Sequence, residues 1–100
     1  MIAEQEIRDR VKRIMMEDFE IPEEHIIPQA TLFAQIGLDS LDSVDLVVAL
    51  EKEFGFKINR IEDEEKIRSM RMLKDVYSFI KYKLGMGPFV PESPPRSENE

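Results

Sequence analysis

The chain has 100 residues, a formal net charge of -7 and no cysteine. A chain of this length forms one small domain with a thin core, and the lack of cysteine excludes disulfides and thiolate catalysis. A single histidine, His25, also excludes a histidine metal cluster, so we expect no metal site.

The charge is unevenly distributed along the sequence. Residues 38–65 carry nine acids against three bases, whereas residues 66–84 carry six bases against one acid. The acidic block repels nucleic acid and favours basic protein surfaces as partners. The basic block lacks the arginine and aromatic platforms of nucleic-acid sites, so we expect no nucleic-acid binding.

The N-terminal segment does not have the pattern of a signal peptide. Residues 1–20 alternate charged with apolar residues, and no apolar run approaches the roughly 20 residues that cross a bilayer. We therefore expect a soluble, cytoplasmic protein without a membrane span, and a monomer.

The first half of the chain predicts one helix and a long connection. Apolar residues at helical spacing predict a helix over 3–19 with Ile7, Val11, Ile14 and Met15 on its buried face. Pro22 ends it, because proline lacks the amide that a helix needs. Residues 22–37 carry too many apolar side chains for a free loop, and we expect this connection to pack across the helices through Ile26, Ile27, Leu32 and Phe33.

The second half predicts three more helices. The second helix spans 40–54 and stops at Gly55, a C-terminal glycine cap. Residues 57–62 are predicted to be irregular, and Asp63 opens a short third helix that carries Ile67 and Met70. The last helix covers 72–84, with a stripe formed by Leu73, Val76, Tyr77, Ile80 and Leu84.

Four helices without strands predict an all-α fold, a small four-helix bundle with a long first connection. Residues 85–100 contain four of the six prolines and show no periodicity. This composition predicts a disordered C-terminal tail. The expected organisation is a helical domain over 1–84 and a tail over 85–100.

The second helix has two apolar faces. Leu46, Val47, Leu50 and Phe54 form an ordinary core stripe, whereas Leu41, Val44 and Val48 lie nearly opposite, flanked by Asp45 and Glu51. One interpretation is a helix buried on all sides. The other is a docking stripe rimmed with acids, which gives fast, weak and salt-sensitive contacts.

Ser40 stands at the start of this helix, directly after Asp39. Either residue is a typical N-cap. A helix start also suits a phosphodiester, because the first amides lack internal partners and the macrodipole is positive there. A nucleophilic role for Ser40 is disfavoured, since the G-x-S-x-G elbow is absent and His25 would be the sole base. Calcium is disfavoured too, because acids spaced by three do not match an EF-hand loop.

One segment resembles a known family. Phe33, then Gly37-Leu38-Asp39-Ser40-Leu41-Asp42-Ser43-Val44-Asp45-Leu46, and then Leu50-Glu51-x-Glu53-Phe54-Gly55 closely resemble an acyl carrier protein. The resemblance covers residues 3–84. It implies a four-helix bundle whose Asp-Ser-Leu serine receives 4′-phosphopantetheine from a phosphopantetheinyl transferase, with coenzyme A as the donor.

The resemblance assigns roles to residues of this chain. By position the modified serine is Ser40, preceded by Asp39, and Ser43 stays unmodified. Acyl groups would be attached to the arm as thioesters, without catalysis by the carrier itself. Leu41, Val44, Asp45, Val48 and Glu51 fall on the positions that meet basic patches of ketosynthases, acyltransferases and acyl ligases.

Some features depart from the family pattern. Lys52 lies where bacterial fatty-acid carriers are acidic, and the segment between Ile67 and Leu73 is about two residues longer than usual. These departures favour a specialised carrier of a fatty-acid, polyketide or lipid-modification pathway. An aminoacyl or peptidyl carrier, or a helical adaptor in which Ser40 is only a cap, remain alternatives.

Overall fold

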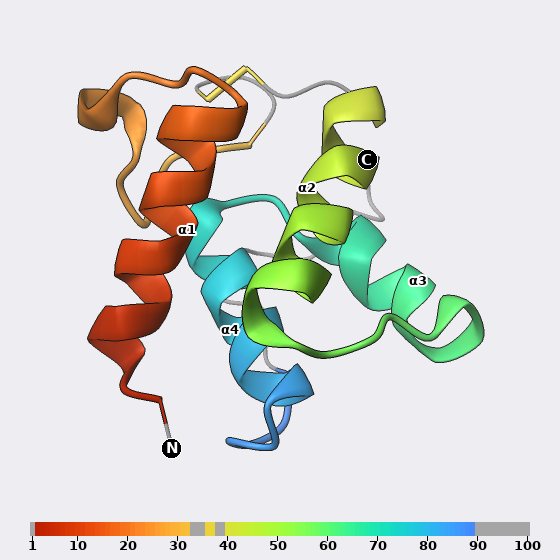
Figure 1. Cartoon of the computed structure of the whole chain (residues 1–100). Helices are drawn as coiled ribbons and strands as arrows, with labels where there is room; N and C mark the ends of the chain where they lie inside the picture. The colour runs from red at the N-terminus through yellow and green to blue at the C-terminus, as the bar shows by residue number, and fades with distance from the viewer. Residues whose placement is uncertain (1, 33–35, 38–39, 90–100) are drawn as a thin grey trace.

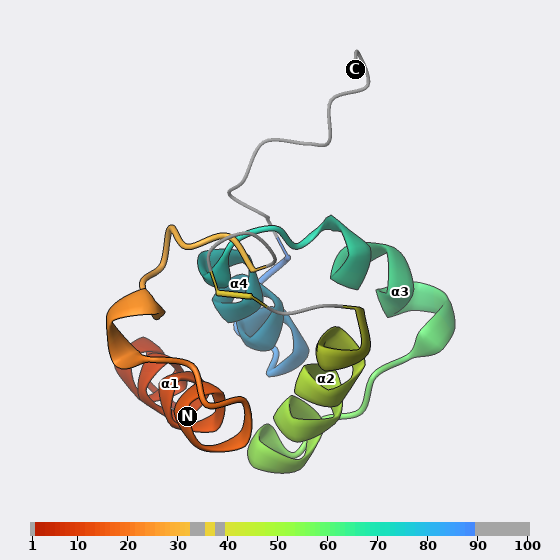
Figure 2. The same ribbon diagram turned by 90° about the horizontal axis from the view of Figure 1, so that it is seen from above.

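The computed structural model describes residues 2–32, 36–37 and 40–89. These residues form, in order, α1 (Glu4–Asp18), a short 3-10 helix η1 (Glu23–His25), α2 (Ser40–Phe54), α3 (Arg60–Ser69) and α4 (Leu73–Lys83). Figures 1 and 2 show α1 and α2 next to each other against α4, with α3 beyond α2. The predicted all-α bundle is confirmed, and none of the helices in this described part is long and apolar enough to cross a membrane.

Helix α1 forms as its periodicity predicts. Ile7, Val11, Ile14 and Met15 are all buried, so its apolar stripe faces the core. Its last turn carries no basic residue, and the chain turns away at Glu20, which has a φ of 57°.

The connection after α1 packs onto the bundle, as predicted. Ile26 and Leu32 are buried, whereas Ile27 is 46% exposed and its predicted packing is wrong. Phe33 lies outside the described residues. The connection is tied to the turn before α4, because the Leu32 amide donates to the Arg71 carbonyl at 2.8 Å and the Leu73 amide to the Ala30 carbonyl at 2.9 Å.

Helix α3 begins earlier than predicted. Asn59 is its N-cap, and the Asn59 side chain accepts hydrogen bonds from the amides of Ile61 and Glu62, each at 2.9 Å. The carboxylate of Asp63 in turn accepts from the Asn59 amide at 2.8 Å. The predicted start at Asp63 is therefore wrong, because a cap formed by one asparagine side chain outweighs the weak apolar signal of this segment. Residues 57–59 are irregular as predicted, whereas 60–62 belong to α3.

A buried ion pair joins α3 to α4. The Asp63 carboxylate is 1% exposed and lies 2.6 Å from the Lys83 ammonium. Burial raises the pKa of Asp63, but the hydrogen bond from Lys83 and that from the Asn59 amide outweigh it, so the net shift is downward. The carboxylate therefore stays ionised when the protein is folded.

Helix α4 fills the centre of the core. Leu73, Val76, Tyr77 and Ile80 are buried as predicted, and Phe79 is buried too because it lies in a cluster of aromatic rings. The ring of Phe79 meets Phe56 at a centroid distance of 6.4 Å and Phe89 at 5.8 Å.

The described chain thus continues to pack after α4. Met86 and Phe89 are partly buried against the core, beyond the predicted domain boundary at Leu84. Residues 90–100 of the predicted disordered tail lie outside the described residues. The boundary between the domain and the tail stays a prediction.

Candidate functional site

Ser40 is the first residue of α2. Gly37, three residues earlier, has a φ of 94°, in a region that favours glycine. The first backbone amides of a helix lack intrahelical acceptors and point toward an approaching anion. The backbone at this point therefore fits the phosphodiester of a phosphopantetheine group. Asp39 and the side chain of Ser40 lie outside the described part of the structure.

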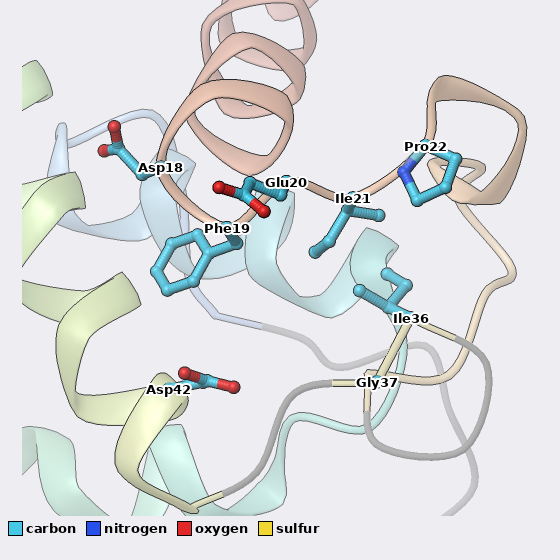
Figure 3. Close-up of a pocket in the computed structure, with 8 residues that line it drawn as sticks. All are labelled: Asp18, Phe19, Glu20, Ile21, Pro22, Ile36, Gly37 and Asp42. Carbon is cyan, nitrogen blue, oxygen red and sulfur yellow. The ribbon is translucent and has the colours of Figure 1, made fainter.

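An acidic cleft opens beside the start of α2 (Figure 3). It has a volume of about 320 Å³ and lies between the end of α1, residues 36–37 and the first turn of α2. Asp18, Glu20 and Asp42 line it together with apolar side chains such as Phe19 and Ile21. Figure 3 shows Asp42 across the gap from Phe19. Three carboxylates make this cleft unsuitable for a phosphate and suitable for the basic side chains of another protein.

The sequence reasoning missed Asp18 and Glu20. The signal was present, because α1 ends in acids without a base in its last turn. Negative charge at a helix C-terminus opposes the macrodipole and weakens the helix. These acids therefore do not stabilise α1, and both line the cleft.

The outward stripe of α2 is exposed to solvent. Val44 is 61% exposed and Val48 is 42% exposed, whereas Leu46 and Leu50 on the opposite side are 3% and 1% exposed. The interpretation of α2 as a helix buried on all sides is therefore wrong for these two valines. The side chain of Leu41, the third predicted member, lies outside the described part.

A shallow groove of about 360 Å³ runs between α1 and α2 along this stripe. Val48 and Ala49 of α2 and Ile14 of α1 give it an apolar lining, with Asp18 and Asp45 at its acidic edge. Asp45 is exposed and has no ion-pair partner among the described residues.

Two other acids of α2, Glu51 and Glu53, already make contacts within the protein. Glu53 lies 2.7 Å from Arg13 and 3.5 Å from Arg10, both on α1. The Glu51 carboxylate accepts a hydrogen bond from the Ile58 amide at 2.7 Å and so supports the segment after α2. Asp45 and Glu51, which the sequence treats alike, therefore differ: the Glu51 carboxylate is held by a backbone amide, whereas Asp45 has no such contact among the described residues.

Comparisons with known proteins agree with this arrangement. Residues 9–62 match a family described as a phosphopantetheine attachment site. An acyl carrier protein of Thermotoga maritima is 36% identical over 85 residues, which cover 85% of this chain and all of that protein. One of Thermosynechococcus vestitus is 35% identical over 79 residues, 79% of this chain and 93% of that protein.

A crystal structure of an acyl carrier protein from Thermotoga maritima has the same fold. It superposes with a TM-score of 0.68 at 28% sequence identity, over 82% of this chain and 91% of that one. From the family match, the two relatives and this structure together, the chain belongs to the acyl carrier protein family and is a carrier of acyl groups with a covalently attached 4′-phosphopantetheine arm.

Proposed function

We propose that Ser40 is the residue that carries the 4′-phosphopantetheine arm. The observation that carries this proposal is the start of α2 at Ser40, inside the matched region 9–62. Ser43 is the competing hydroxyl, but it lies almost one turn inside α2. The arm, once attached, supplies the thiol on which acyl groups travel, and this chain has no cysteine of its own.

The residues around Ser40 would hold the arm without reacting. The first amides of α2 would face the phosphodiester, an interaction of about 0.3–1 kcal/mol at an exposed helix end. Asp39 precedes Ser40 and would help a transferase to recognise it. We infer that the protein has no catalytic activity of its own and that it is the substrate of a phosphopantetheinyl transferase.

We propose that Leu41, Val44, Asp45, Val48 and Glu51 form the docking face of the carrier. The exposure of Val44 and Val48 supports this, since these apolar side chains contribute little burial energy to the fold itself and are accessible to a partner. Asp45 and the acids of the cleft would attract basic patches on the transferase and on ketosynthases, acyltransferases and acyl ligases. Contacts of this kind form quickly and dissociate quickly, as a carrier with several partners requires.

Two further properties belong to this proposal. We expect a monomer, because the exposed apolar stripe is narrow and rimmed with charge, and we expect a cytoplasmic location. The acids at Asp42 and Asp45 favour acyl over aminoacyl cargo, since aminoacyl carriers have fewer acids around the serine. Fatty-acid, polyketide and lipid-modification pathways all fit this chemistry.

Incubation with coenzyme A and a broad-specificity phosphopantetheinyl transferase, followed by mass spectrometry of the intact protein, tests the attachment site. The wild type and Ser43→Ala are expected to gain the mass of one arm, and Ser40→Ala is expected to gain none. An unchanged mass of the folded wild type would instead favour a helical adaptor in which Ser40 is only a cap. Loading of Ser40→Ala but not of Ser43→Ala would move the arm to Ser43.

A further inference from the structure

One side chain of the groove between α1 and α2 has a charge opposite to that of the acidic edge. Lys52 lines this groove together with Asp18, Asp45 and Glu53. Lys52 follows Asp45 by seven residues on α2, which is about two turns, so both lie on the same face of the helix and about 10 Å apart along its axis. The groove therefore has an acidic edge and, two turns further along α2, a cation.

The directions of the two helices give the groove this order of charges. Helices α1 and α2 run in opposite directions (Figure 1). The end of α1 therefore lies beside the start of α2, where Asp18 and Asp42 line the acidic cleft together. The middle of α1 lies beside the end of α2, where Arg10 and Arg13 contact Glu53. Acids thus gather at the first end of the groove, whereas at the second end two arginines share one carboxylate.

The charge of Lys52 is not neutralised within the described part of the protein. Its side chain is exposed and forms no ion pair or hydrogen bond with a described residue. The acids next to it in the sequence have other contacts, because Glu53 lies against the two arginines of α1 and Glu51 accepts a hydrogen bond from the Ile58 amide at 2.7 Å. The groove therefore presents a cation at one end and acids at the other.

An apolar floor lies between the two ends. Ile14, Val48 and Ala49 form it, and Val48 is 42% exposed. The volume of about 360 Å³ accommodates an apolar side chain or the aliphatic stem of an arginine. Such a floor binds many apolar groups about equally well, so the charges at the two ends decide which partner fits.

We propose that Lys52 makes the groove selective for a partner helix that presents a basic residue and, two turns away, an acidic residue. A helix lying along the groove places residues seven apart on one face, at the same spacing of about 10 Å. Its basic residue would meet Asp18 and Asp45, and its acidic residue would meet Lys52. A helix with basic residues at both places would be attracted at one end and repelled at the other. This selectivity rests on the docking face proposed above, to which it adds Asp18 and Lys52.

Two cross-linked helical peptides of about 15 residues test the proposal. The base–acid peptide carries an arginine and, seven positions later, a glutamate, with a leucine between them; the base–base peptide carries arginine at both positions. Their dissociation constants are obtained from ¹H–¹⁵N correlation spectra of the full-length, arm-bearing protein at an ionic strength of about 0.1 M, where charges more than about 10 Å apart are largely screened. We expect the wild type to bind the base–acid peptide about threefold more tightly, because an ion pair with Lys52 replaces a repulsion.

Substitutions of two lysines separate the local effect from that of net charge. Lys52→Glu should reverse the preference, and Lys52→Gln should bind both peptides about equally, because it removes the charge without reversing it. The matched control is Lys57→Glu, since Lys57 is also exposed, forms no ion pair among the described residues and does not line the groove. It changes the net charge as Lys52→Glu does and should keep the preference of the wild type. Thermal melting checks that each variant is folded, and Lys52→Gln serves alone if Lys52→Glu melts early.

The position and pattern of the shifts decide between the outcomes. Saturable shifts should centre on Asp45, Val48 and Lys52. Equal affinity of the wild type for both peptides, or the same change in Lys57→Glu as in Lys52→Glu, would overturn the role of Lys52 and leave the docking face standing. Shifts that never saturate with either peptide would overturn docking in the groove as well. Groove shifts that depend on protein concentration without peptide would assign the groove to a second copy of the chain and overturn the proposal.

Discussion

Replacing Lys83 with methionine is expected to destabilise the bundle strongly. Methionine keeps most of the apolar stem but leaves the Asp63 carboxylate, which is 1% exposed, without its cation. The second oxygen of this carboxylate, Oδ1, already lacks a hydrogen-bond partner among the described residues. Breaking a buried pair by removing one partner costs about 3–5 kcal/mol, and the 15% exposure of the Lys83 side chain favours the lower end. A loss of about 3 kcal/mol lowers the Tm of a domain of this size by roughly 12–24 °C.

The pH dependence of this loss identifies its cause. In the wild type the pKa of Asp63 is below its ordinary value of 3.8, so its contribution to stability is complete above that value and is lost as the pH falls through the folded pKa. In Lys83→Met burial is no longer offset by the lysine, so the pKa of Asp63 moves upward. The folded variant then takes up a proton at a higher pH than the folded wild type, so its stability deficit relative to the wild type shrinks as the pH falls through the folded pKa of the variant.

Thermal unfolding followed by circular dichroism at about pH 7 and about pH 4, close to the ordinary pKa of an aspartate, measures both effects. Lys57→Met is the control, because Lys57 is exposed and forms no ion pair among the described residues. Asp63→Asn with Lys83→Met should recover part of the loss, since no buried charge is left. A Lys83→Met variant that melts within about 3 °C of the wild type, or a deficit that is the same at both pH values, would refute the reasoning.

Three further substitutions test the docking face, the α3 cap and the C-terminal packing. Asp45→Lys should slow loading by the transferase at low salt without a change in Tm. Glu51→Lys should slow loading and also lower the Tm, because the Glu51 carboxylate accepts a hydrogen bond from the Ile58 amide. Loading rates of the two variants equal to that of the wild type at low salt would contradict the docking face. Asn59→Ala should cost about 1 kcal/mol through the lost cap, measured by urea unfolding, and no change would mean that the cap contributes nothing. Phe89→Ala should cost about 1–2 kcal/mol, since the side chain is only partly buried; a Tm equal to that of the wild type would show that this ring does not stabilise the core.

Local patterns predicted the helices that carry strong local signals. Helix α2 has the predicted bounds because a glycine precedes it and Gly55, with a φ of 76°, ends it. Helix α3 has little apolar periodicity, and Ile61 within it is 91% exposed, so hydrophobic spacing could not locate its start. Its start depends on the side chain of Asn59, and an asparagine before a charged segment is a signal that can be read from sequence.

The site was predictable where it lies on one helix and unpredictable where helices meet. The position of Val44 and Val48 on one exposed stripe follows from the angular distribution of side chains around α2 alone. The acidic cleft joins α1 to α2. Another cleft, of about 350 Å³, joins Arg8 on α1 to Lys74 and Lys81 on α4, and we call it the basic cleft because three of its four charged lining residues are cations. The sequence does place Lys74 and Lys81 on one face, since they are seven residues apart, but only the packing of α1 against α4 adds Arg8 to them.

The opposite charges of the two clefts affect how a basic partner approaches the molecule. A basic partner surface is attracted to Asp18, Asp42 and Asp45 and is repelled by the basic cleft, so it meets the α2 side first. Among the residues that the structure describes, none lines both the acidic and the basic cleft, and none of α2 lines the basic cleft. The distribution of charge therefore orients a basic partner toward α2 before contact is made.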